Sequence, residues 1–358
     1  METGALPVAL INKRRVLDNI CRMQERARCS GASFRPHFKT HQSLEIGEWF
    51  RDLDIQSITV SSPAMAQFFM ANGWDDCLIA LPMHAGAVPV YNELAPSRNL
   101  ELLTDSVVAV QAVDRALQQR VGLWIEVDAG YQRTGVPFHN LPALIELACV
   151  IEESTHFELR GLLIHAGQSY SCKGKEALAD LFADQMRRLN TMRTALVEAG
   201  FDNVRISYGD TPCCSGLDSL TGVDELRPGN FVFYDLMQEN IGACEEADIA
   251  LAVSCPVIGV YPERSQVLIH GGAVHFSKES LTYDSGLTIF GKVVENQLNG
   301  WGNPLSGCYL RGMSQEHGVI EGTEDWVKQQ KVGGVVTILP VHSCLTMNLL
   351  RPDFIEVG

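Results

Sequence analysis

The sequence predicts an α/β protein: a (β/α)8 TIM-type barrel followed by a second, mainly β domain at the C-terminal end. Over the first two thirds of the 358 residues, short apolar runs alternate with helical patterns, which is typical of a parallel sheet. Eight such runs occur, the number of strands in this barrel. After about Asp235 the pattern changes to strand-like runs separated by Gly-, Pro- and Asn-rich turns.

The expected elements follow in chain order. The barrel strands are Ser33–Phe38, Ser57–Val60, Cys77–Ala80, Asn99–Leu103, Gly122–Val127, Arg160–Ile164, Val204–Ser207 and Asn230–Phe233. Helical patterns between them are Ala64–Asn72, Ser106–Gln118, Leu141–Glu153 and Glu176–Ala199, and the last precedes Gly200, a suitable C-cap residue. The later strands are Leu251–Val260, Gln266–Ile269, Gly291–Val294 and Val335–Leu339. We therefore expect a barrel domain over residues 12–240 and a β domain over residues 241–358, joined by residues 1–11.

Composition limits the function classes. The formal net charge of −15 argues against nucleic-acid and anionic-membrane partners and favours a protein that binds small molecules. Residues 1–10 lack the pattern of a signal peptide, and no stretch approaches the roughly 20 apolar residues that span a bilayer. Eleven cysteines without CxxC pairs indicate reduced thiols and a cytoplasmic protein.

Polar residues follow the ends of the predicted strands, where barrel enzymes carry their chemistry. They include Lys39, Asp128, His165, Gly209 and Tyr234. An amine, an imidazole, a phenol and a glycine turn suit a site for amine and carbonyl chemistry.

Lys39 ends the first predicted strand, where burial would cost its ammonium group hydration. Burial and the neighbouring Arg35, His37 and His41 would lower its pKa and make it a better nucleophile and base. The alternative interpretation is an ordinary surface lysine.

Two turns near the last barrel strands could hold a phosphate, which such barrels often bind there. Gly209 permits close approach of the backbone, and Thr211 offers a hydroxyl and an amide donor. Gly229 and Asn230 form the second turn. The alternative is a pair of ordinary connecting turns.

His342 and Cys344 form the second distinctive motif. On a strand or extended segment, residues two apart share one face, so an imidazole and a thiolate could supply half of a tetrahedral zinc site. Thiolate suits zinc better than Mg. Arg133, in a turn after the fifth strand, could pair with Asp128 or face a cofactor ring.

Taken together, these motifs resemble the D-threonine aldolase and D-serine dehydratase family, relatives of alanine racemase. The resemblance covers nearly the whole chain, and its strength is the joint order of the motifs. They occupy residues 35–41, 126–130, 133–135, 165–170, 207–212, 225–235, 315–318 and 340–344.

The resemblance implies pyridoxal 5′-phosphate (PLP) bound covalently to Lys39, and zinc, in preference to Mn or Mg, at His342 and Cys344. It makes Lys39, His165 and His317 the catalytic residues, with His317 near the metal or substrate. It also implies a homodimer with its active site at the subunit interface. The implied cofactor-binding residues are Lys39, Arg133, His165, Tyr170, Ser207, Gly209, Thr211, Gly229, Asn230 and Tyr234.

The implied reaction is dehydration of a D-β-hydroxy amino acid to a 2-oxo acid and ammonia. Retro-aldol cleavage to glycine and an aldehyde is the alternative, and Cys344 favours the dehydratase because aldolase-like members more typically carry Asp there. Amino-acid racemisation and non-catalytic PLP binding also stay open, as does the substrate among D-serine, D-threonine and D-3-hydroxyaspartate. Two positions depart from the family. Asp210 replaces a small hydroxyl residue, so its charge should point away from the phosphate, and His270 replaces an acidic residue, which leaves the role of its loop open.

Overall fold

The computed structural model describes residues 6–96, 98–350 and 354–358. The chain divides into two compact units. One is Cys21–Gly229, and the other combines Met1–Ile20 with Asn230–Gly358. The boundary at Ile20 falls within helix α1 (Lys13–Cys29), whose apolar residues recur at helical spacing.

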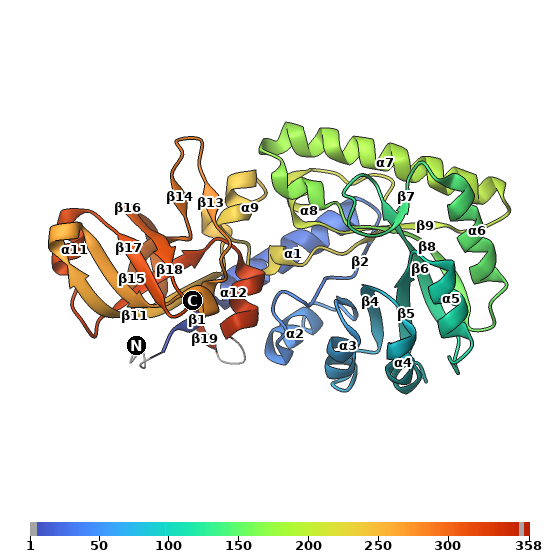
Figure 1. Ribbon diagram of the computed structural model, residues 1–358, viewed down its shortest axis with the longest axis horizontal. Coiled ribbons are helices and arrows are strands. Elements are labelled where there is room, and N and C mark those ends of the chain that lie inside the picture. The colour runs from blue at the N-terminus through green and yellow to red at the C-terminus, as the bar shows by residue number, and fades with distance from the viewer. Residues whose placement is uncertain (1–5, 97, 351–353) are drawn as a thin grey trace. The chain divides into compact units, whose positions relative to one another are not determined.

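The unit Cys21–Gly229 is built on a parallel sheet with the strand order β2-β10-β9-β8-β6-β5-β4-β3 (Figure 1). The chain after β2 bridges to β3 through His37 and Thr59, which brings the two ends of the sheet together. This arrangement confirms the predicted eight-stranded barrel. The strands are β2 (Ser33–Phe34), β3 (Ser57–Val60), β4 (Asp76–Pro82), β5 (Asn99–Thr104), β6 (Val121–Asp128), β8 (Phe157–Ile164), β9 (Arg205–Tyr208) and β10 (Glu225–Leu226), with β7 (Val136–Pro137) paired to β6.

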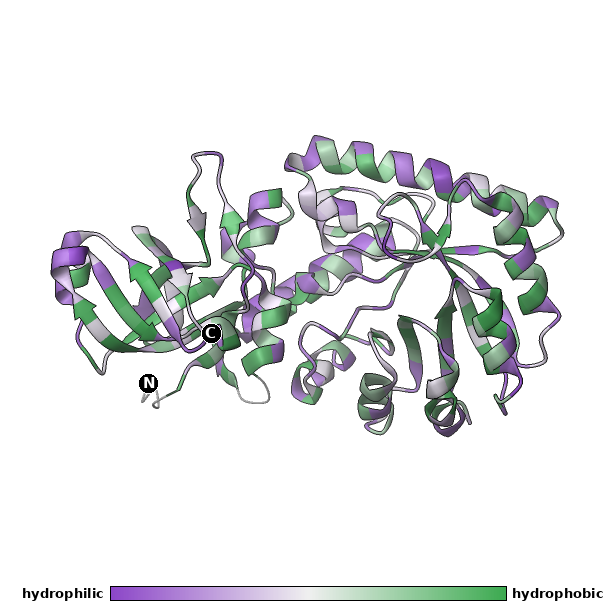
Figure 2. Ribbon diagram, viewed as in Figure 1, coloured by the Kyte–Doolittle hydropathy of each residue, from purple (hydrophilic) through white to green (hydrophobic). Residues whose placement is uncertain are grey.

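Helices follow most barrel strands. Ser43, Ser62 and Ser106 begin α2, α3 and α5 by accepting a backbone N–H of the first helical turn. Figure 2 shows the strands as largely hydrophobic, whereas α7 mixes hydrophobic and hydrophilic residues along its length. The helices are α2 (Leu44–Arg51), α3 (Pro63–Met70), α4 (Val88–Leu94), α5 (Val107–Asp114), α6 (Leu141–Glu152), α7 (Gly174–Glu198) and α8 (Thr211–Gly216), with the 3-10 helices η1 (Ala85–Ala87) and η2 (Gly167–Ser171).

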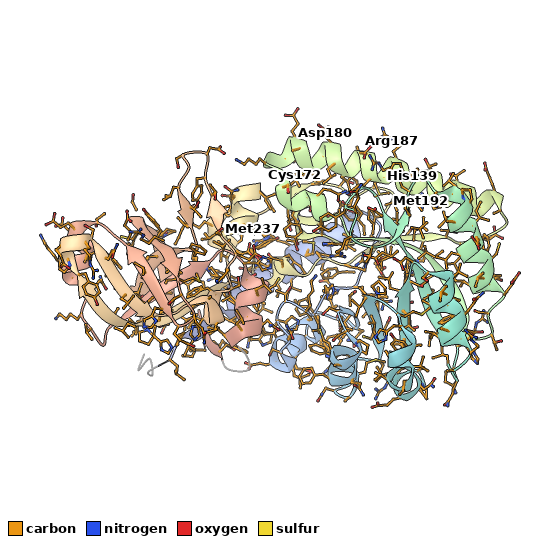
Figure 3. The ribbon with its side chains drawn as sticks, in the orientation of Figure 1. His139, Cys172, Asp180, Arg187, Met192 and Met237 are labelled. Atoms are coloured by element: carbon orange, nitrogen blue, oxygen red, sulfur yellow. The ribbon has the colours of Figure 1, made fainter. Side chains whose placement is uncertain are left out.

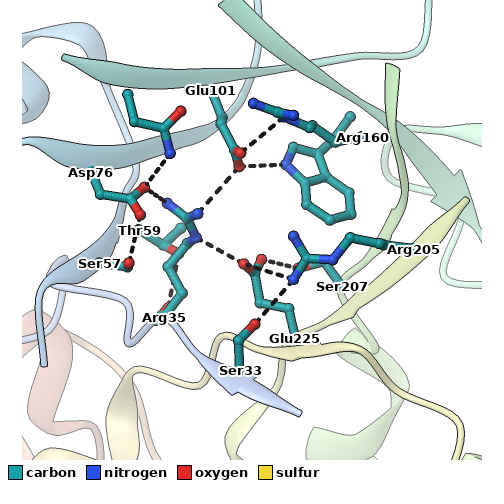
Figure 4. Close-up of polar contacts among 12 residues, drawn as sticks. Ser33, Arg35, Ser57, Thr59, Asp76, Glu101, Arg160, Arg205, Ser207 and Glu225 are labelled. Carbon is teal, nitrogen blue, oxygen red and sulfur yellow. Dashed lines mark hydrogen bonds and ion pairs between the residues drawn. The ribbon is translucent and has the colours of Figure 1, made fainter. Parts of the chain in front are cut away.

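A buried ion-pair network lies near the starts of the barrel strands (Figure 4). Arg35 donates to Glu225 at 2.8 Å and to Asp76 at 2.5 Å, and it lies 3.4 Å from Glu101, which also pairs with Arg160. Because three carboxylates surround Arg35 at this end of the strands, the expectation that it adds positive potential beside Lys39 was wrong.

The eighth predicted strand was also wrong. Asn230–Phe233 is not extended; Asn230–Val232 form the 3-10 helix η3, and the eighth barrel strand is the two-residue β10 just before it. A short apolar run does not distinguish a strand from one helical turn. The following Tyr234 is buried with a φ of 48°, a left-handed conformation that is costly for a bulky residue.

The second unit contains a mostly antiparallel sheet with the order β12-β17-β16-β15-β18-β11-β1-β19, and β12 also pairs with β11. The N-terminal strand β1 lies in this sheet, antiparallel to β11 and parallel to β19. The strands are β1 (Val8–Asn12), β11 (Leu251–Tyr261), β12 (Gln266–His270), β15 (Gly291–Gln297), β16 (Gly300–Met313), β17 (His317–Glu321), β18 (Val335–Pro340) and β19 (Phe354–Val357), and a separate hairpin contains β13 (Leu281–Thr282) and β14 (Thr288–Ile289). The helices are α9 (Leu236–Ile241), α10 (Ala273–Phe276), α11 (Glu324–Gln329), α12 (Ser343–Leu350), η4 (Glu246–Asp248) and η5 (Pro262–Arg264).

Over the residues that the structure describes, no helix combines the length and the apolar character needed to cross a membrane.

Candidate active site

Lys39 lies in a turn after β2, and its side chain is exposed. The prediction of a buried lysine was therefore wrong. The turn is fixed by its neighbours, because His37 donates its backbone N–H to Pro228 at 2.9 Å and the Lys39 N–H points to His37 Nδ1 at 3.4 Å. The backbone around Lys39 is thus held in place, while the side-chain amine is accessible.

The two histidines beside Lys39 are not cations. Burial lowers the pKa of His37 well below its usual range, and the charges of Lys39 and Arg227 add to this effect. Burial likewise lowers the pKa of His41 to about 3, and its ring packs against Phe38 and Phe50. Both rings are neutral near pH 7, so the expectation that they supply positive potential was wrong.

His165 follows β8 and is held in one orientation. Its Nδ1 lies 2.7 Å from the Gly209 carbonyl oxygen, to which a neutral ring donates its N–H. Burial, followed by the charge of Lys39, lowers the pKa of His165 to about 3. The ring lies near both Tyr131 and Tyr170, with centroid distances of 6.2 and 6.3 Å. A ring with so low a pKa is too weak a base to take up a proton near pH 7, so it is better suited to packing and orientation than to proton transfer.

Arg227 is a residue that the sequence did not single out, although it lies within one of the family motifs. It is 4% exposed and donates to Ser207 Oγ and to the Ile164 carbonyl oxygen, both at 2.6 Å. Burial lowers its pKa to about 10, so it stays charged. The guanidinium would lie 2.9 Å from a Cβ at Gly209, which explains the glycine there. Arg227 therefore places a fixed positive charge next to the predicted phosphate turn.

Ser207 has its hydroxyl engaged inside the barrel. It donates to Glu225 Oε1 at 2.7 Å and accepts from Arg227. This hydroxyl therefore orients Arg227, and the predicted cofactor contact of Ser207 has no support from its side chain.

Thr211 begins α8 and is 1% exposed. Its buried Oγ1 has no hydrogen-bond partner among the described residues. The preceding Asp210 is the N-cap of α8 and accepts the Cys213 N–H at 2.7 Å. Burial raises the pKa of Asp210 to about 6. One carboxylate oxygen of Asp210 is thus bonded by its own helix, whereas its other oxygen, like the Thr211 hydroxyl, is buried without a hydrogen-bond partner among the described residues.

Gly229 follows β10, the strand next to β9 in the sheet. A Cβ there would lie 3.0 Å from the His37 carbonyl oxygen and from Thr40 Oγ1, so the turn lies directly against the Lys39 segment. Because β2, β10, β9 and β8 are consecutive in the sheet, Lys39, Gly229, Thr211 and His165 follow four adjacent strands.

Arg133 does not pair with Asp128, one of the two alternatives for its side chain. Its guanidinium lies 3.8 Å from Glu126 and 5.7 Å from the centre of the Tyr131 ring. Asp128 instead accepts the backbone N–H groups of Gly130 and Gln132, so the suggested Arg133–Asp128 pair was wrong.

In the other unit, His342 and Cys344 meet, but not on an extended segment. β18 ends at Pro340, and Cys344 is already the second residue of α12, so the expected strand geometry was wrong. A hydrogen bond between the two side chains nevertheless joins them. Although burial lowers the pKa of His342, this bond and the charges of Cys344, Asp235 and Glu279 raise it to about 9. The His342 Nδ1 is buried and has no partner among the described residues.

Asn230 supports this pair. Its amide nitrogen lies 3.5 Å from Cys344 Sγ and 3.1 Å from Ser343 Oγ. The buried Asp235 fixes the arrangement by accepting from Asn230 at 2.6 Å and from the Ser343 N–H at 2.9 Å. Sequence reasoning placed Asn230 at the phosphate and missed Asp235, because a contact across 114 residues leaves no local pattern.

His317 belongs to the same unit as His342 and Cys344 but to a different element. It begins β17, is exposed, and pairs across the ladder with His270 of β12.

Known protein families match both the N-terminal and the C-terminal part of the chain. Residues 11–236 match the family described as Alanine racemase, N-terminal domain, and residues 250–354 match the Putative serine dehydratase domain. The D-threo-3-hydroxyaspartate dehydratase of Delftia sp. (strain HT23) is 33% identical, over 95% of this chain and 91% of that protein. The chain belongs to this dehydratase family. The D-serine dehydratase of Dictyostelium discoideum is 30% identical, over 95% of this chain and 90% of that protein.

Solved structures agree. The structure of the Delftia dehydratase superposes with a TM-score of 0.89, at 32% identity, over 96% of this chain and 92% of that chain. A cysteine-to-alanine mutant of a D-threo-3-hydroxyaspartate dehydratase, in a metal-free form, gives a TM-score of 0.89 at 30% identity, over 98% of this chain and 94% of that chain. The D-threonine aldolase from Filomicrobium marinum, at 19% identity and a TM-score of 0.82 over 99% of this chain and 93% of that chain, shares the fold.

Proposed function

We propose that this protein is a PLP-dependent lyase that removes the β-hydroxyl group of small D-configured 3-hydroxy amino acids, giving a 2-oxo acid and ammonia. The observation that carries the proposal is the His342–Cys344 pair with the Asn230 amide directed at its sulfur. Two relatives that match along 95% of the chain are named as dehydratases, whereas the aldolase likeness concerns the fold. These observations favour dehydration over retro-aldol cleavage.

The barrel residues fit PLP. Thr211 offers a buried hydroxyl without a partner, and Gly209 and Gly229 stand where a Cβ would collide with neighbours. Lys39 offers an accessible amine on an anchored turn. When bound, PLP would delocalise the negative charge that develops at Cα. We infer that Lys39 holds its aldehyde, that Thr211 and the two glycine turns hold its phosphate, and that Arg227 contributes positive charge to this region.

The second unit fits a zinc ion. An imidazole and a thiol are ligands that zinc favours, and the Asn230 N–H would stabilise the thiolate from outside the ligand set. Among the described residues, His342 and Cys344 form no three-ligand group with another His, Cys, Asp or Glu, so water and substrate would complete the coordination. Zinc there would act as a Lewis acid on the departing hydroxyl.

Different residues of the chain then have different roles in the reaction. The Lys39 amine would be the group that holds the cofactor and that accepts the proton from Cα. His165 stays neutral and keeps its orientation through Gly209, so it positions without exchanging protons near pH 7. His342 and Cys344 hold the site at which the hydroxyl leaves.

A panel of D-amino acids tests the proposal, with ammonia, aldehyde and the L-enantiomer measured separately. We expect ammonia and a 2-oxo acid from D-serine or a D-3-hydroxyaspartate, and no product from the L-isomers. Glycine with an aldehyde would make the protein an aldolase, and the L-enantiomer alone would make it a racemase.

We also propose that the protein acts as a homodimer in the cytoplasm. All eleven cysteines are free, which fits a reducing compartment. Sedimentation of the purified protein tests the dimer.

A further inference from the structure

We propose that His270, His275 and Glu316 form a second divalent-cation site, distinct from the His342–Cys344 pair, for a first-row transition ion such as Zn²⁺. Each of the three residues offers a ligand atom, and these atoms lie within 4.8 Å of one another. Two imidazoles and one carboxylate are an established ligand set for zinc and for other ions of this class, with open positions for water.

The spacing is close to what an ion requires. His270 Nε2 lies 3.5 Å from Glu316 Oε2. Zinc–ligand bonds of about 2.0–2.2 Å at tetrahedral angles separate two ligand atoms by roughly 3.3–3.6 Å. This pair is therefore already at the spacing of a bound ion, and only His275 needs to approach by about 1 Å.

The backbone that carries the three ligands is fixed. Gly271 donates its N–H to the Glu316 carbonyl oxygen at 2.9 Å, and Ala273 donates to Ser314 at 2.8 Å. A Cβ at Gly272 would lie 2.3 Å from the Gln315 carbonyl oxygen, so the two segments approach more closely than any other residue would allow. The ligands thus belong to one hydrogen-bonded scaffold at the ends of β12 and β17, and not to independent loops.

His275 is ready to act as a ligand. Its ring centre is 5.2 Å from that of His270. A neutral ring has one lone pair, which accepts the Gly272 N–H at 3.2 Å through Nδ1. An ion would have to replace this long hydrogen bond, so we expect moderate affinity.

An isolated His270–Glu316 ion pair is the simpler interpretation, but it does not explain why the His275 imidazole lies beside this pair. The two rings lie 5.2 Å apart, centre to centre, and a divalent ion would use both imidazoles together with the Glu316 carboxylate. In the described part of the chain, the salt-bridge partner of Glu316 is His270 and not a lysine or arginine.

Binding would connect distant elements of this unit. α10 carries His275 and contacts α12, where Thr346 Oγ1 donates to the Phe276 carbonyl oxygen at 3.4 Å. α12 also carries Cys344. An ion at the triad would therefore stiffen the segment on which α12 packs.

Metal titration of the full-length protein tests the site independently of activity. In the Cys344→Ala protein, which removes the sulfur site, we expect one Zn²⁺ per chain. Co²⁺ used as a probe should then give a spectrum without sulfur-to-cobalt charge transfer. Adding Glu316→Gln, a conservative change of an exposed residue, should weaken Zn²⁺ binding at least tenfold, as should adding His275→Ala. The matched control adds His139→Ala, an exposed histidine just before α6 (Figure 3), and should leave binding unchanged.

The proposal is overturned if the Cys344→Ala protein binds no Zn²⁺ at millimolar concentration. It is equally overturned if Glu316→Gln and His275→Ala leave the affinity unchanged. Circular dichroism and thermal unfolding without metal verify that each variant is folded. Because the readout is binding, failure of the triad leaves the proposed dehydratase activity untouched.

Discussion

Asp210 offers a prediction with a calculable magnitude. This carboxyl group is fully buried as the N-cap of α8, and burial raises its pKa from 3.8 to about 6. Asn is an equally good N-cap residue, so Asp210→Asn should keep the hydrogen bond from the Cys213 N–H while removing the charge.

The direction of the pH dependence follows from how tightly the folded and the unfolded protein bind the Asp210 proton. The folded protein holds the Asp210 proton more tightly than the unfolded chain, so its contribution to stability is greatest below pH 3.8 and is lost as the pH rises through about 6. The loss amounts to about 1–2 kcal/mol at pH 5 and about 3 kcal/mol at pH 8. Asp210→Asn should therefore stabilise the protein by about these amounts, with the larger gain at the higher pH.

Urea-induced unfolding of wild type and Asp210→Asn between pH 5 and pH 8, followed by tryptophan fluorescence, measures this difference. Asp202→Asn removes one exposed carboxylate and controls for the change in net charge. A stability difference that does not grow with pH, or a less stable Asp210→Asn protein at pH 8, would refute the reasoning.

Three further predictions concern the proposed site. Thr211→Val should weaken PLP binding about tenfold, the loss of one hydrogen bond of about 1–2 kcal/mol, in an absorbance titration of the apoprotein, and unchanged affinity would remove Thr211 from the phosphate site. Borohydride reduction should fix PLP on Lys39 in a peptide map and fix none in Lys39→Ala, whereas labelling of another lysine would overturn the assignment. Mixing Lys39→Ala with Cys344→Ala subunits should restore part of the activity. No recovery in verified mixed dimers would mean that each site uses residues of one chain.

The fold could be predicted from the sequence where periodicity is long or strands are buried on both faces. Seven of the predicted barrel strands coincide with or overlap observed ones, and α6 and α7 match their predicted ranges within two residues. β10 was missed because it is two residues long and begins with Glu225, a charge whose burial is compensated by Arg35, 190 residues away. β16, the longest strand, was missed because Pro304 and four glycines interrupt its pattern.

The candidate site was predictable only as a set of residue types. Glycine turns and a His-x-Cys motif are visible in the sequence, whereas pairings are not. The side chains of Arg227 and Asn230 are oriented by hydrogen bonds to residues far along the chain, Ile164 and Ser343 respectively. The Lys39 exposure and the helical position of Cys344 likewise depend on how neighbouring segments pack, which no local pattern encodes.

The central claim is that the barrel residues activate Cα while His342 and Cys344 release the β-hydroxyl group. Incubating the Cys344→Ala protein with D-serine in deuterated water tests this division directly, with exchange at Cα followed by NMR and ammonia measured in the same sample. We predict that exchange at Cα continues while ammonia release stops. Full ammonia release by metal-free Cys344→Ala protein would contradict the claim.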